Sequence, residues 1–169
     1  MIAIIFLSQL VLGYVAWLLV FAAYILPRFR TIPRLEVQRA IATVHGFRFF
    51  GLVFLVPGVV GPHLPSSFAV SAAWGDFATG CLAILALMTF RIRPLFWVCV
   101  VAYTLTGIAD LVVNYAHASQ AGVPDMAGEL GATYIIPVLY VPILMITHVT
   151  AVYWLMRPRS KAGPDEKIA

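Results

Sequence analysis

The fold is decided by the N-terminal stretch IAIIFLSQLVLGYVAWLLVFAAYIL, residues 2–26, which carries no charged side chain. An α-helix needs about 20 mainly apolar residues to cross about 30 Å of hydrocarbon, and this stretch is long enough. It lacks the basic start and the small-residue cleavage site of a secretory signal peptide. We therefore interpret it as the first membrane-spanning helix.

Four further apolar stretches follow, at residues 40–60, 68–90, 95–115 and 133–156, separated by short polar segments. Their apolar residues run continuously instead of alternating, which favours membrane helices over the strands of a barrel. The sequence thus predicts an all-α fold, a polytopic membrane helix bundle of five transmembrane helices. Residues 1–156 form a single transmembrane domain, and residues 157–169 form a polar cytoplasmic tail.

The composition agrees with a protein that lives in lipid. Hydrophobic residues make up 62% of the 169-residue chain and charged residues only 11%, whereas soluble domains carry about 25% charged residues. A chain this short could not hide so much apolar surface from water. The lipid bilayer is therefore the expected partner, and we attribute the net charge of +4 to membrane topology and not to nucleic-acid binding.

Basic residues follow every second predicted span. They occur after the first, third and fifth spans, and the other two loops contain neither Lys nor Arg. Because short cytoplasmic loops are enriched in basic residues, the N-terminus is expected outside and the C-terminus inside. The residues that set this orientation are Arg28, Arg30, Arg34, Arg39, Arg91, Arg93, Arg157, Arg159 and Lys161.

Four ionisable residues lie inside the predicted spans: Arg48, Asp76, Asp110 and His148. Charged groups in hydrocarbon are costly and usually mark functional sites. Counting residues from the span ends places Arg48 and His148 nearer the cytoplasm and the two aspartates nearer the outside. Structural roles also remain open, because Arg48 could extend to the headgroups, the aspartates could pair with it, and His148 could be a core residue.

The fourth span carries a polar stripe. Residues at spacings of three and four share one face of a helix, and the residues at this spacing are Tyr103, Thr106, Asp110, Asn114 and His117. In the third span, Gly75 and Gly80 flank Asp76 and would allow another helix to come close. The predicted set of ligand- or proton-binding residues is therefore Arg48, Asp76, Asp110, Asn114, His117 and His148.

Several short motifs resemble those of an uncharacterised family of small polytopic bacterial inner-membrane proteins. The motifs are Arg48-Phe-Phe-Gly51, Leu64-Pro-Ser-Ser-Phe-Ala69, Gly75-Asp76 with Gly80, Gly107-Ile-Ala-Asp110, and Pro137…Val141-Pro142…His148. The resemblance covers roughly residues 40 to 155. It implies a multi-pass protein of the bacterial inner (plasma) membrane and a shared polar core of Arg48, Asp76, Asp110 and His148, but no activity.

The residues favour a polar intramembrane site for a small molecule, an ion or a proton, in a transporter or a binding protein. Asp76 and Asp110 could share a proton or bind a cation, and His148 could relay protons. A single unit this small would transport as a homo-oligomer.

Three other functions stay open. The first is a haem-binding redox protein, with axial histidine pairs at two depths, namely His45 with His148 and His63 with His117. The second is a metal-dependent membrane enzyme that uses Asp76, Asp110 and His117. No known catalytic motif supports this second option, so no catalytic residue is assigned. The third is an accessory subunit of a larger membrane complex.

Overall fold

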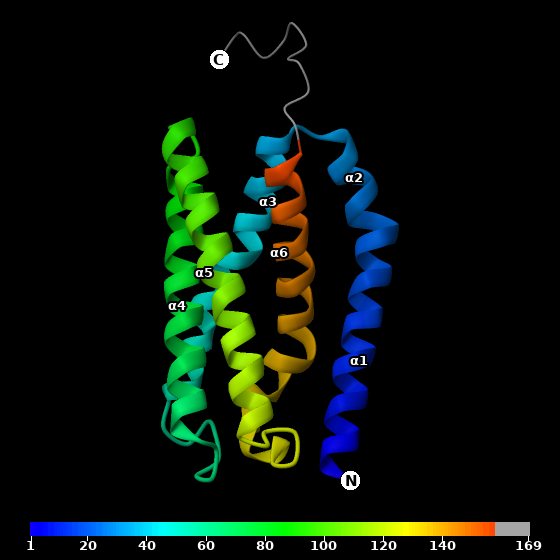
Figure 1. Ribbon diagram of the computed structural model, residues 1–169, viewed down its shortest axis with the longest axis vertical. Coiled ribbons are helices and arrows are strands. Elements are labelled where there is room, and N and C mark those ends of the chain that lie inside the picture. Colours follow the sequence, from blue (N-terminus) through cyan, green and yellow to red (C-terminus); the bar gives the residue numbers. More distant parts are fainter. Residues whose placement is uncertain (158–169) are drawn as a thin grey trace, which may run out of the picture.

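The computed structural model describes residues 1–157 as helices aligned along one axis (Figure 1). All secondary structure of this part of the chain is helical, which confirms the all-α prediction. Of the predicted cytoplasmic tail, residues 158–169 lie outside the described residues. The α-helices are α1 (Ile2–Val20), α2 (Leu26–Thr31), α3 (Arg34–Gly46), α4 (Ser66–Met88), α5 (Arg93–Gln120) and α6 (Val141–Met156). The π-helical turns are η1 (Phe21–Ile25) and η4 (Ile136–Tyr140), and the 3₁₀ helices are η2 (Phe47–Leu55) and η3 (Ala127–Tyr134).

Four helical runs are long and apolar enough to cross a membrane: Ile2–Thr31, Ser66–Met88, Arg93–Gln120 and Ile136–Met156. They correspond to the first, third, fourth and fifth predicted spans. The first run and α5 extend past the predicted span ends, because a helix need not stop where the sequence becomes polar. In the first run, the π-helical turn lies just before Pro27. Such turns help a helix accommodate a proline, which lacks the N–H donor.

The predicted second span, residues 40–60, is not one continuous α-helix. Regular helix begins earlier, at Arg34, and stops at Gly46, where the tighter η2 takes over up to Leu55. The buried residues of η2 are Arg48, Gly51 and Phe54. Their spacing of three matches the three residues per turn of a 3₁₀ helix. A 3₁₀ run of nine residues is unusually long, and such stretches often mark hinges or strained sites.

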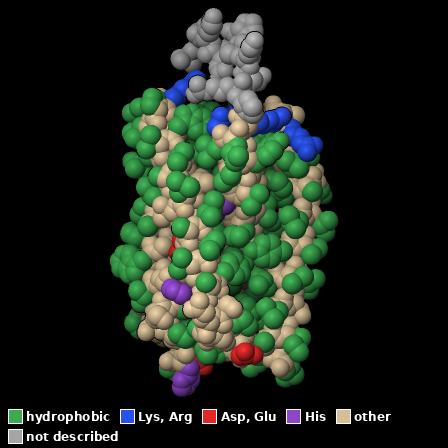
Figure 2. Space-filling view, in the orientation of Figure 1, with side chains coloured by type: hydrophobic (Ala, Val, Ile, Leu, Met, Phe, Trp, Pro, Cys, Tyr) green, Lys and Arg blue, Asp and Glu red, His purple; other side chains and the backbone are tan. Residues whose placement is uncertain are grey.

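Charge is segregated along the bundle axis. On the face that Figure 2 shows, the Lys and Arg side chains gather at the end where α6 finishes, and acidic and histidine side chains lie further toward the other end. We call these the basic end and the acidic end. The basic end carries residues of α2, α3 and the start of α5, and the acidic end carries the loops that hold His63, Asp125 and Glu129.

The buried apolar residues form two cores. The basic-end core consists of Val37, Ile41, Ala42, Ala83, Ala86, Phe96, Cys99, Val100, Tyr103, Ala151 and Trp154. The acidic-end core consists of Phe6, Phe54, Leu64, Phe68, Ala69, Ala72, Ala73, Val123, Ala127, Leu130 and Ile136. Small residues of α4 contribute to both cores. They let α3, η2 and α5 pack closely against α4, as expected for helices that associate by tight packing in lipid.

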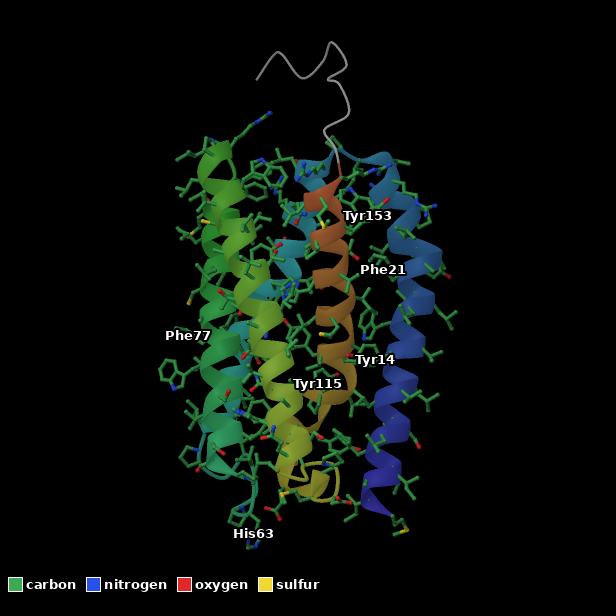
Figure 3. All side chains as sticks on the ribbon, in the orientation of Figure 1. Tyr14, Phe21, His63, Phe77, Tyr115 and Tyr153 are labelled. Atoms are coloured by element: carbon green, nitrogen blue, oxygen red, sulfur yellow. The ribbon has the colours of Figure 1, made fainter. Side chains whose placement is uncertain are left out.

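Helix α1 lies at the edge of the bundle (Figure 1). It packs mainly on η4 and α6, and Trp17 Nε1 donates a hydrogen bond to the Leu139 carbonyl over 2.8 Å. The hydroxyls of Tyr14 on α1 and Tyr115 on α5 are 2.7 Å apart and point toward one another (Figure 3). Because lipid tails give helices no hydrophobic reason to associate, such polar contacts help to hold α1 in place.

Candidate functional site

Arg48 is the centre of the polar site. It is the second residue of η2, and its side chain is fully buried (0% exposed). The change from α-helix to 3₁₀ helix at Phe47 places Arg48 on the inner face of this segment, in line with Gly51. Arg48 therefore does not reach the headgroups, which rules out the alternative that it snorkels out of the bilayer.

Two carboxylates bind the Arg48 guanidinium. Its Nε donates to Asp76 Oδ1 on α4 over 2.6 Å, and its Nη2 donates to Asp110 Oδ2 on α5. Both aspartates are nearly buried, with 11% and 7% of their side chains exposed. One guanidinium balances only one of the two carboxylates, so the cluster holds a surplus negative charge when both acids are ionised. An uncompensated charge in low-dielectric surroundings strongly favours uptake of a proton or a cation.

The third guanidinium nitrogen of Arg48 faces α5 and α6. Nη1 lies 3.5 Å from the Gly107 carbonyl oxygen and 3.2 Å from His148 Nε2. Because arginine can only donate hydrogen bonds, His148 Nε2 must accept, so the imidazole is neutral with its proton on Nδ1. The ring of His45 stacks on that of His148 with 4.0 Å between ring centroids. His148 is thus an integral part of the cluster.

Glycines make room for the charged side chains. A Cβ atom on Gly75 would overlap the Asp110 carboxylate, and one on Gly51 would overlap the Asp76 side chain. A Cβ on Gly107 would meet His148 and Arg48. Gly51, Gly75 and Gly107 of the sequence motifs are therefore explained by close contacts with the cluster, since a larger residue would displace one of its side chains.

The cluster forms the floor of a cavity of about 330 Å³. Apolar side chains make most of its wall, and the polar groups on its floor are Asp76, Asp110 and Asn114. Asn114 Nδ2 donates to Asp110 Oδ1 over 2.8 Å. Residues of the turn after α5, among them Gly122 and Asp125, also line the cavity, so it extends toward the acidic end. Its other lining residues come from α1, η2, α4, α5, η3, η4 and α6.

Comparison with known proteins gives one match, to the family described as Domain of unknown function (DUF8737), over residues 5–156. The matched segment runs from α1 to the last residue of α6. The chain belongs to this family. No curated protein and no solved structure matches the chain. The family description carries no activity, so the chemistry must be argued from the site of this DUF8737 member.

The structure brings together five of the six predicted site residues of this family member: Arg48, Asp76, Asp110, Asn114 and His148. The sixth, His117, is partly buried further along α5 and does not line the cavity. The predicted stripe on α5 is therefore divided, because Tyr103 belongs to the basic-end core and His117 lies beyond the cluster. The prediction missed the α1 residues Phe6, Leu7 and Leu10 in the cavity wall, since apolar residues there look the same as lipid-facing ones.

The histidines do not form the haem site considered from the sequence. A haem must lie between its two axial imidazoles, but the ring centroids of His45 and His148 are only 4.0 Å apart, which leaves no space for it. His63 sits in the loop at the acidic end, where its backbone N–H donates to Glu129 Oε2. Across residues 1–157, no group of three or more His, Cys, Asp and Glu side chains is placed to hold a metal ion. The arrangement at Asp76, Asp110 and His117 therefore does not fit a metal centre.

Proposed function

We propose that the chain is a multi-pass protein of a bacterial plasma membrane that crosses the bilayer five times. Four crossings are made by the four long apolar runs. The remaining crossing, the second along the chain, is made by α3 and η2 together, which run alongside the other helices of the bundle (Figure 1). The 13 residues of α3 rise about 1.5 Å each, and the nine of η2 rise about 2.0 Å each. Their combined length of nearly 40 Å exceeds the roughly 30 Å hydrocarbon core. The basic end then faces the cytoplasm, and the cavity extends toward the outside.

In this proposal, the protein is a transporter or a binding protein whose site at Arg48, Asp76 and Asp110 takes up a proton or a cationic small molecule. The observation that carries the proposal is the single buried guanidinium between two carboxylates at the floor of a cavity. Uptake of a proton or a cation at the cavity floor neutralises the surplus negative charge of the two carboxylates. A surplus carboxylate charge in these buried surroundings supports the proposal, because it favours uptake of a positive charge.

Infrared difference spectra of the full chain in lipid, recorded between acidic and alkaline buffer, test this proposal. We expect a band from a carboxylic acid protonated in apolar surroundings. Asp110→Asn should abolish it, because Arg48 and Asp76 then form a balanced pair. Glu36→Gln, on α3 at the basic end and outside the cavity lining, is the matched control and should keep the band. The same band in wild type and Asp110→Asn would contradict the proposal.

Transport is tested in proteoliposomes with an imposed pH gradient. The gradient should decay faster with wild type than with the double variant Asp76→Asn/Asp110→Asn, because proton exchange needs the carboxylates. The gradient should decay with Glu36→Gln as it does with wild type. Equal decay in wild type and the double variant would remove transport and leave a binding protein.

A further inference from the structure

We propose that the cavity binds an amphipathic amine, a molecule with an apolar body and a protonated nitrogen that carries N–H donors. This inference rests on the proposed function and names the ligand class of the same site. The cavity offers three independent constraints on its occupant, namely the hydrogen-bonding character of the floor, the nature of the walls and the charge of the cluster.

The floor presents acceptors to the cavity. All three guanidinium nitrogens of Arg48 already face protein acceptors. Within residues 1–157, no donor bonds the second oxygen of Asp76, Oδ2, and the buried Asn114 Oδ1 also has no partner. Asp76 is only 7% exposed and lines the cavity. An occupant must therefore bring donors, because buried acceptors without partners are costly.

The walls exclude a bare hydrated ion as the natural occupant. Aromatic and aliphatic side chains surround the space above the floor, including Phe6, Leu10, Phe54, Phe68, Leu111 and Ile136. The cavity volume of about 330 Å³ lies at the low end of the range for small-molecule sites. Apolar walls gain from contact with an apolar body and cannot replace the water shell of an ion.

The charge of the cluster selects a cation over a neutral donor. The ammonium group of the ligand and a proton neutralise the same surplus carboxylate, so they compete. The titratable and charged groups around this carboxylate are Arg48, Asp76, His45 and His148, with Tyr115, Tyr140 and Asp125 further out. Arg48 and the neutral His148 cannot supply the missing charge, so ligand binding should release a proton from the aspartate pair.

Equilibrium dialysis of the full chain in phosphatidylcholine nanodiscs tests the ligand class, with empty nanodiscs subtracting partition into lipid. The probes share one body and differ in the head group: phenylbutylamine, phenylbutanol and phenylbutyrate. We expect the amine to bind at least tenfold more tightly than the alcohol, and the carboxylate to bind weakest. Amine binding should tighten as pH rises toward neutrality and should release protons into a weakly buffered medium.

Variants separate the floor from the wall. Asp110→Asn should weaken amine binding at least tenfold while leaving alcohol binding unchanged, and Glu36→Gln, on α3 outside the cavity lining, should leave both unchanged. Ala118→Phe, which fills part of the cavity, should weaken both the amine and the alcohol.

The failures are distinguishable. Equal affinity for all three probes, or an amine affinity insensitive to Asp110→Asn, would overturn the ligand class. If the carboxylic-acid band of the wild type persists in that case, the proton site of the proposed function stands. A wild type without that band would overturn both.

Discussion

The two ends of the bundle both contain a core of buried apolar side chains, but only the core at the acidic end borders the cavity. At the basic end, Gln38 Nε2 donates to the Ala151 carbonyl over 2.8 Å, and the basic-end core contributes no residue to the cavity. At the acidic end, most residues of the acidic-end core line the cavity. The groove at the basic end, bordered by Arg30 and Arg157, lies on the outer side between α2 and α6. The comparison shows that the basic end is closely packed and the acidic end encloses a cavity, with the ion cluster at the boundary between them.

The strongest way to break this division is to remove Arg48. Arg48→Met leaves two carboxylates buried without a partner, so the free energy of unfolding should fall by about 3–5 kcal/mol. Thermal or denaturant unfolding in detergent measures the loss. Arg30→Met, at an exposed position of the basic end, is the control and should change stability little. Adding Asp76→Asn and Asp110→Asn to Arg48→Met should restore most of the loss, and failure to do so would show that Arg48 acts through shape and not through charge.

A smaller effect is expected from crowding the cluster. Gly75→Ala places a methyl group on the Asp110 carboxylate, and overpacking of this kind costs about 1–3 kcal/mol. The matched change Gly128→Ala meets no atom within 4 Å and should be tolerated. Unfolding midpoints of the two variants check this, and an equal loss in both would contradict the close contact between α4 and α5.

A matched pair of valines compares the two cores directly. Val100 lies in the basic-end core and Val123 in the acidic-end core, and both are almost fully buried. Val100→Ala should cost about 1–2 kcal/mol by leaving a new void. Val123 already borders the cavity, so it loses fewer contacts and Val123→Ala should cost less. A larger loss for Val123→Ala in the same unfolding assay would reverse the assignment of the packed and the open end.

The smallest effect concerns the contact between α1 and α5. Tyr14→Phe removes the hydrogen bond to Tyr115, which is worth about 0.5–1.5 kcal/mol. Tyr24→Phe, on an exposed residue of η1, is the control and should be neutral. Hydrogen exchange of the α1 backbone measures the effect, and faster exchange is expected with Tyr14→Phe alone.

The sequence predicted the bundle well, and the reasons are physical. Uncharged runs such as residues 2–26 cannot fold in water, and charges such as Asp76 and Asp110 must turn away from lipid. The pairing of Arg48 with both aspartates was only one open alternative, because it depends on the change from α-helix to 3₁₀ helix at Phe47. Hydropathy does not distinguish these two helix types, and the second predicted span was therefore wrong as a continuous α-helix.

The cavity was also beyond the sequence. Its floor was partly visible as the polar face with Asp110 and Asn114, but its walls are apolar residues of segments far apart in the chain. Leu10 on α1 and Leu130 in η3 carry no pattern that separates a ligand-facing from a lipid-facing side chain. His117 was assigned to the site because it continues the helical spacing, but it does not line the cavity, which is bordered on this part of α5 by Ala118 and Ser119.

Several bonds between helices end on main-chain oxygens. The pairs are Trp17 to Leu139, Arg34 to Leu155, Gln38 to Ala151 and Tyr140 to Val44. In each pair, only the donor residue needs a particular side chain, because every residue type offers the same main-chain carbonyl as the acceptor. Leu139, for example, is 47% exposed, and another residue at this position would offer the same carbonyl oxygen to Trp17. These helix contacts should therefore leave no correlated substitutions between related chains. Methods that infer contacts from such correlated changes should detect the ion cluster far more readily than these bonds to main-chain oxygens.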